Sequence, residues 1–243
     1  MLEPGLSEEA LWAKLPSLTA EDLVPLLSYP STRDRHVVKV LHRPDLSESF
    51  LGEVAHSKWV GSARVQFNLV NHPNTPLGEA MNFVKFLFWR DLNLVIQNFR
   101  LSSEVRHHAE AVLQQRLPAM AAGEKVTLAR LAAGQILKIL RNDKDPKVIK
   151  ALLENSRIVE EDVLFLVSQN RTPTPVLEEV ARDPRWSSRR EVRMALLRNP
   201  RTPLSTTSSF ISNLTTTEMK ALVNDMKVPL PVRRMLQNRL GKS

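Results

Sequence analysis

The chain has 243 residues, of which 42% are hydrophobic and 25% are charged, as in a soluble globular protein long enough to bury a sizeable core. It contains no cysteine, which excludes disulfides, thiolate metal sites and a cysteine nucleophile. The net charge is +8, yet residues 181–243 hold 13 Lys and Arg against 4 Asp and Glu, and the rest of the chain is close to neutral. The basic character therefore belongs to the C-terminal quarter.

The composition favours short helices. Leucine, alanine, glutamate, arginine and lysine are plentiful, and the 16 prolines cannot sit inside long helices. The acidic N-terminal stretch lacks the basic and apolar regions of a secretory leader. No window approaches the roughly 18 consecutive apolar residues of a membrane span. We expect a soluble, cytoplasmic, all-α protein that does not associate with membranes.

Turn signals separate helix-like runs along the first part of the chain. Turns fall at residues 28–32 and again at 71–76, where the apolar run 65–70 ends in Asn-His-Pro-Asn-Thr-Pro. Residues 117–130 contain Pro118 and then Thr127, which indicates a connection followed by a new helix start rather than a flexible linker. Further turns are expected at 145–146, 170–175 and 183–184.

The C-terminal part shows the same punctuation more sharply. A helix is expected from Trp186 to Asn199, and Pro200 ends it. Thr202 and Pro203 have the residue types of an N-cap and a first helical position. Thr215 and Glu218 have the spacing of a capping box, and a last helix is expected over 232–240.

The chain aligns with itself at an offset of 127 positions. The match runs from Trp59 over Trp186 to Arg106 over Arg233, and it superimposes the turns at 71–76 and 198–203. We expect an internal duplication, about 37–117 and 163–240, within a single domain covering 1–243. Helix-like segments also start with valine at 65, 105, 148, 192 and 232, and periods of this size are typical of α-helical repeats.

Residues 170–203 resemble the leucine-rich repeat variant family, which has asparagine–proline turns and a Val-Arg helix start. The residues that carry the resemblance are Leu177, Val180, Ala181, Asp183, Val192, Arg193, Asn199 and Pro200. The resemblance implies a right-handed α-helical solenoid related to HEAT repeats, and a HEAT-like unit of two or three helices fits the 40–44 residue spacing equally well. The family's cysteine-ligated iron–sulfur module has no counterpart here, so no cofactor is expected.

The candidate binding residues form a basic face around one tryptophan. In a continuous helix, Trp186, Arg189, Arg190 and Arg193 would share one side. We include their basic neighbours in the candidate site, which then comprises Arg182, Arg185, Trp186, Arg189, Arg190, Arg193, Arg198 and Arg201. Such a face could hold phosphates while the indole stacks on a base. Alternatively, Trp186 packs between repeats, as its equivalence to Trp59 indicates, and the arginines are solvated.

Nothing in the sequence marks a catalytic or metal site. The six histidines lack ligand spacing, no glycine-rich phosphate loop occurs, and no serine has a local base partner. We therefore expect a non-enzymatic scaffold that binds a protein partner. The alternative is nucleic-acid binding through the basic C-terminal face, with an enzymatic form by analogy to HEAT-like DNA glycosylases, none of whose motif residues can be placed here.

Overall fold

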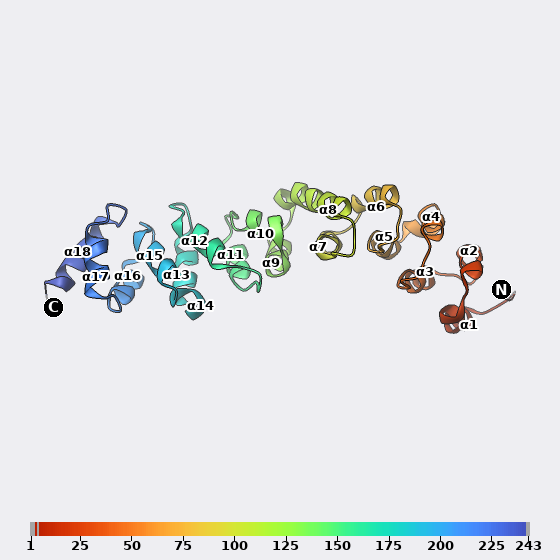
Figure 1. Ribbon diagram of the computed structural model, residues 1–243, viewed down its shortest axis with the longest axis horizontal. Helices are drawn as coiled ribbons and strands as arrows, with labels where there is room; N and C mark the ends of the chain where they lie inside the picture. The colour runs from red at the N-terminus through yellow and green to blue at the C-terminus, as the bar shows by residue number, and fades with distance from the viewer. Residues whose placement is uncertain (1–2, 4, 242–243) are drawn as a thin grey trace. The chain divides into compact units, whose positions relative to one another are not determined.

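The computed structural model describes residue 3 and residues 5–241, and this part of the chain is helical without any strand (Figure 1). It contains 18 α-helices of 4 to 14 residues and three short 3-10 helices. Short helices are what the prolines predict, and the all-α class is confirmed. Residues 1, 2 and 4 of the N-terminal stretch used above lie outside the described residues.

Among the described helices, none combines the length and the apolar character that crossing a bilayer requires.

The chain divides into two compact units, residues 1–119 and 120–243. The helices of the first unit are α1 (Glu8–Lys14), α2 (Ala20–Ser28), α3 (Asp34–Leu41), α4 (Glu48–Ala55), α5 (Ala63–Val70), α6 (Leu77–Val84), α7 (Trp89–Gln97) and α8 (Ser103–Arg116), with 3-10 helices η1 (Leu15–Ser17), η2 (Lys58–Gly61) and η3 (Leu117–Ala119). The division falls within residues 117–130, but a helix start at Thr127 is wrong, because α9 begins at Ala122 and runs through this residue. The single domain over 1–243 stays a prediction.

The helices of the second unit are equally short. They are α9 (Ala122–Leu131), α10 (Gly134–Leu140), α11 (Pro146–Leu153), α12 (Glu160–Ser168), α13 (Thr174–Arg182), α14 (Pro184–Ser187), α15 (Arg190–Arg198), α16 (Leu204–Ile211), α17 (Thr216–Val223) and α18 (Leu230–Leu240).

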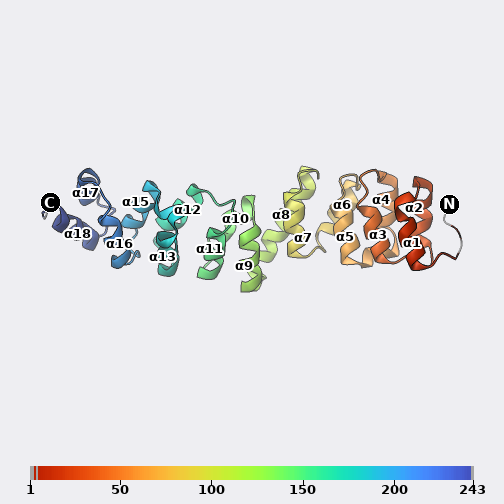
Figure 2. The ribbon, with the colours of Figure 1, turned by 90° about the horizontal axis from the view of Figure 1, so that it is seen from below.

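Helices of the first unit pack in two layers. Figure 1 shows α4, α6 and α8 in one row and α3, α5 and α7 in the other, and Figure 2 shows α1 to α6 as successive neighbouring pairs. Contacts agree with this picture, because α3 packs on α5, α6 packs on α8, and α5 packs on α6 between the layers. Each helix buries its apolar side against these neighbours, and Leu51 and Leu69 are fully buried.

The same element order and packing partners occur in the second unit. Helices α3 to α8 of unit 1 correspond in order to α12, α13 and α15 to α18 of unit 2, and η2 corresponds to α14. The contacts of α5 with α3, α6 and η2 are matched by those of α15 with α12, α16 and α14. The contacts of α8 with α6 and α7 are matched by those of α18 with α16 and α17. Equivalent helices begin within one residue of the 127-position offset found in the sequence.

Four threonines, three of them buried and Thr75 half-buried, tie their turns to the preceding helix in the same way. In each case the hydroxyl donates to the carbonyl of a leucine six residues earlier, as in Thr32 to Leu26 (2.7 Å), Thr75 to Leu69 (2.5 Å), Thr172 to Leu166 (2.6 Å) and Thr202 to Leu196 (2.6 Å). The expectation that Thr202 is the N-cap of the next helix is wrong, because Pro203 occupies that position and the threonine side chain points back. The hydroxyl is a second donor to a carbonyl at the helix end, which also accepts the backbone N–H three residues later.

Candidate functional site

The structure breaks the helix on which the basic face was predicted. Helix α14 ends at Ser187, Arg189 has an extended backbone (φ −78°, ψ 127°), and α15 begins at Arg190. The expectation that Trp186, Arg189, Arg190 and Arg193 share one helical side is therefore wrong. Two helix pieces separated by an extended residue do not keep the i, i+3, i+4, i+7 register.

Trp186 lies in the interior rather than on a surface. Its side chain is 2% exposed, and the guanidinium carbons of Arg185 and Arg189 lie 4.6 Å and 5.2 Å from the ring centroid. The equivalent ring of Trp59 has Lys58 at 4.8 Å, and its Nε1 donates to Leu27 O at 2.8 Å. Both tryptophans are thus packed beside cations, and the buried ring of Trp186 is not positioned to stack on an incoming base.

Most arginines of the predicted face are already paired with carboxylates. The ion pairs join Arg182 to Glu178 at 3.5 Å, Arg185 to Asp183 at 3.4 Å, Arg189 to Glu160 at 2.6 Å, Arg190 to Glu191 at 3.0 Å and to Glu218 at 3.1 Å, and Arg198 to Asp225 at 2.7 Å. The other two donate to backbone carbonyls, Arg193 to Ser188 and Arg201 to Arg171, both at 3.3 Å. These pairs cancel much of the positive charge that the sequence places here.

The structure brings the C-terminal end of the predicted face into a hollow of unit 2. Arg198, Asn199 and Pro200 at the end of α15 line it together with residues 225–229 of the turn between α17 and α18 and with Leu230 at the start of α18. Arg233 of α18 completes the rim, and the volume of the hollow is about 920 Å³. The other predicted residues, from Arg182 to Arg193 and Arg201, do not line it.

The hollow is lined by both charged and apolar side chains. Nε of Arg198 donates to Asp225, and this bond is the main reason that the pKa of the Asp225 carboxyl is lowered. Nη1 of Arg233 lies 3.5 Å from Sδ of Met226, and its Nε is inaccessible without an acceptor. Met226 is 81% exposed and Leu230 is 53% exposed. Cations and large apolar side chains therefore face the same space.

Sequence reasoning missed the most exposed apolar side chains. Phe99 of unit 1 and Met226 of unit 2 have the highest exposed fractions among the large hydrophobic residues described, 82% and 81%. They occupy equivalent positions at the 127-residue offset, as do Arg106 and Arg233. The self-alignment contains this signal, but exposure of an apolar residue in a turn is visible only in the structure.

A smaller hollow of about 230 Å³ lies in the same unit, around Arg141. The Arg141 guanidinium carbon lies 3.9 Å from the centroid of Phe165, and its Nη1 donates to Asp162 at 2.8 Å. Stacking and an ion pair engage this arginine within the fold, so we assign the small hollow no ligand.

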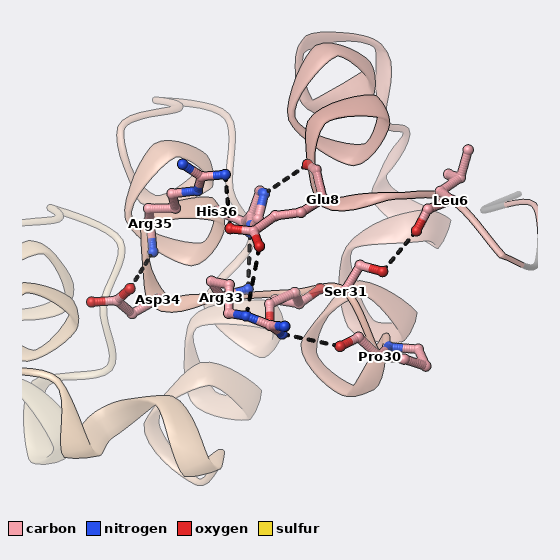
Figure 3. Close-up of polar contacts among 9 residues, drawn as sticks. Leu6, Glu8, Pro30, Ser31, Arg33, Asp34, Arg35 and His36 are labelled. Atoms are coloured by element: carbon pink, nitrogen blue, oxygen red, sulfur yellow. Dashed lines mark hydrogen bonds and ion pairs between the residues drawn. The ribbon is translucent and has the colours of Figure 1, made fainter.

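In unit 1 a cluster of polar side chains joins α1 to α3 (Figure 3). The Glu8 carboxylate lies 2.7 Å from Arg35 and 3.8 Å from Arg33. His36 is fully buried, its Nδ1 accepts from Arg33 N at 2.9 Å, and its Nε2 faces Glu8 O at 3.3 Å. Because Nδ1 accepts a hydrogen bond, the ring proton is on Nε2, which donates to the backbone carbonyl of Glu8. Every one of these groups is used to hold helices together.

Within the described residues, no group of three or more His, Asp or Glu side chains is placed to bind a metal ion. The buried histidines are engaged with the backbone. His72 accepts from Asn74 N at 3.2 Å and faces Arg43 O at 2.9 Å, as His36 does with its own partners. These rings therefore act as structural hydrogen-bonding groups.

By its fold this chain is an all-α protein, and helices occur in matching order in its two units. No family model, no curated protein and no solved structure matches it.

Proposed function

We propose that the chain is a non-enzymatic α-helical repeat protein, a solenoid of the HEAT or leucine-rich repeat variant kind, that binds a protein partner. The observation that carries this proposal is the matching order and packing of α3–α8 and α12–α18. Helical repeats bury their apolar faces against neighbouring repeats and leave long surfaces for binding other molecules. Their loops and exposed side chains then determine what binds.

Local charge cancellation supports a protein partner over nucleic acid. The phosphate backbone attracts a continuous surface of unpaired cations, whereas Arg182, Arg189 and Arg190 each lie within 3.5 Å of a carboxylate. The hollow of unit 2 adds apolar side chains, Met226 and Leu230, to a polar wall. Mixed surfaces of this kind are typical of protein interfaces.

Nucleic-acid binding is the second candidate, and one observation favours it. Two exposed rings and the half-buried ring of Trp89 in unit 1 have cations against them, with Lys85 at 5.2 Å from Phe86, Arg90 at 5.2 Å from Trp89 and Arg106 at 5.1 Å from Phe99. Rings beside cations suit the stacking of single-stranded bases. The arginines of the predicted basic face belong to unit 2 and these rings belong to unit 1, so each group needs its own variant.

Affinity isolation with the full chain as bait distinguishes the two candidates. We expect a stoichiometric protein to be retained from native lysate with and without nuclease treatment. Loss of every stoichiometric protein after nuclease would contradict the proposal. In a second arm, binding to single-stranded and duplex DNA at low salt is compared between the wild type and an Arg189/Arg190/Arg193→Ala variant. We expect weak binding that the variant leaves unchanged; a clear loss would favour nucleic acid instead.

A further inference from the structure

The turn between α7 and α8 and the turn between α17 and α18 are fixed by equivalent hydrogen bonds. Asn98 donates to Asn71 Oδ1 at 2.9 Å, and at the matching place Asp225 accepts from Arg198 at 2.7 Å. In both turns the same side chain accepts the backbone N–H two residues later, at 3.1 Å and 2.9 Å. The turns are therefore held to the ends of α5 and α15 in the same way.

Each of these anchored turns presents one large apolar side chain to solvent. Phe99 is 82% exposed and Met226 is 81% exposed. A guanidinium from the following helix lies against each, with Arg106 Cζ 5.1 Å from the Phe99 centroid and Arg233 Nη1 3.5 Å from Met226 Sδ. With most of their surface exposed, Phe99 and Met226 do not belong to the buried core of either unit. The same exposed arrangement occurs in both units.

Cations adjoin the apolar side chain in both turns. Arg100 and Lys227 directly follow Phe99 and Met226. In unit 2, Asp225 is the one carboxylate among the residues lining the hollow, and Arg198 engages it. The positive charges of Lys227 and Arg233 therefore dominate the rest of that space. A ligand that fits must bring negative charge together with apolar surface.

We propose that these two turns are equivalent binding points for a segment of a partner protein that carries an acidic side chain next to an apolar one. This inference rests on the proposed function of protein binding and names the chemistry of the partner. The exchange of Phe99 for Met226 favours protein over nucleic acid, because a thioether fills apolar gaps but lacks the flat ring that stacks on a base.

Selection of a displayed library of random peptides on the full chain tests the proposal. The enriched peptides are synthesised, and their stoichiometry and affinity are measured by calorimetry. We expect them to carry Asp or Glu beside Leu, Ile, Met or Phe, and to bind at two sites per chain. Replacing the acidic residue by its amide is expected to weaken binding about tenfold, as for loss of one strong interface contact.

Variants in the turns identify the sites. Phe99→Ser and Met226→Ser are each expected to leave one peptide site per chain, and the double variant none. Arg233→Gln is expected to weaken the site in unit 2 about tenfold. Arg234→Gln, an exposed neighbour on α18 that does not line the hollow, is the charge-matched control and is expected to change nothing. Circular dichroism spectra of each variant are compared with that of the wild type to check that the variant is folded.

Three outcomes would overturn the inference. Peptides that bind the double variant as tightly as the wild type would place the partner elsewhere and leave protein binding itself intact. The same would follow if enriched peptides lacked acidic or apolar residues. Failure to enrich any peptide, together with oligothymidylate binding that Phe99→Ser weakens, would overturn the proposed function as well.

Discussion

At the residue scale, a buried asparagine and a buried histidine perform the same task at equivalent positions. Asn199 donates to Val167 O at 2.6 Å and to Gln169 O at 3.1 Å, and it accepts from the backbone two residues later. His72, 127 positions earlier, faces Arg43 O and also accepts from the backbone two residues later. Each side chain connects its own turn to backbone carbonyls 29 to 32 residues earlier in the chain.

We expect Asn199→Ala to lower the free energy of unfolding by about 2–3 kcal/mol, because the buried carbonyl of Val167 loses its side-chain donor and Arg201 N loses its acceptor. His72→Asn retains both a donor and an acceptor, so it is expected to cost less than His72→Ala. Urea denaturation measures all three. If His72→Asn were as destabilising as His72→Ala, the equivalence of the two side chains would be wrong.

Two aspartates should give opposite pH dependences. Burial raises the pKa of the Asp91 carboxyl, whereas the bond from Arg198 lowers that of Asp225. The contribution of Asp91 to the free energy of unfolding is greatest at pH values below its unfolded pKa of about 3.9. It is lost as the pH rises through the higher folded pKa. The stabilising contribution of Asp225 is present at pH values above its unfolded pKa of about 3.9, and it is lost as the pH falls through the lower folded pKa.

Asp91→Asn is therefore expected to raise the unfolding midpoint at neutral pH, and the gain should vanish in acid below both pKa values. The same change at Asp225, Asp225→Asn, is the matched control, and it should lower the unfolding midpoint at neutral pH. Urea titrations across this pH range provide the measurement. Parallel pH profiles for the two variants and the wild type would contradict both assignments.

At the element scale, four threonines bond back to the helices that precede them and stabilise those helix ends. We expect Thr202→Val, which keeps the side-chain shape and removes the hydroxyl, to cost about 1–2 kcal/mol because the carbonyl of Leu196 loses a buried partner. Thr217→Val on the exposed first turn of α17 is the control and should cost much less. A difference smaller than the error of urea denaturation would show that the bond does not stabilise the turn.

The sequence predicts these elements where local chemistry decides them. The proline turns are where they were expected, α16 begins at Leu204, and the capping box of Thr215 and Glu218 is confirmed. The break at Arg189 was missed because no proline or glycine marks it. The direction of the Thr202 side chain was missed because capping patterns do not distinguish a bond to the next helix from one to the preceding helix.

At the scale of the whole molecule, charge along the chain is a poor guide to charge on the surface. The excess of arginine after residue 181 predicts a basic face, but Arg189 and Arg190 find their carboxylates 29 and 28 residues away. Glu160 belongs to a segment that looks neutral by itself. Such pairs depend on how helices stack, so the sequence could propose the residues of the site but not their electrostatic state.

The division into two units also predicts how the chain unfolds. Each unit has a buried core of its own, around Leu51 and Leu69 in the first and around Leu177 and Leu196 in the second. Because helical repeats gain stability from their immediate neighbours, a unit with several helix pairs should hold its structure alone. We expect the fragments 1–119 and 120–243 each to be helical and to unfold cooperatively in urea.

Circular dichroism and urea titration of the two fragments and the full chain check this expectation. If the units are independent, Leu196→Ala should destabilise fragment 120–243 and the full chain by similar amounts, about 3–5 kcal/mol for a fully buried leucine, and should leave the signal of the first unit unchanged. Unfolded fragments, or one transition in which Leu196→Ala shifts the whole chain, would instead favour the single cooperative domain that the sequence predicts. The measurement thereby distinguishes two independent units from one cooperative domain, which have the same helices and differ only in whether unfolding of one unit is coupled to that of the other.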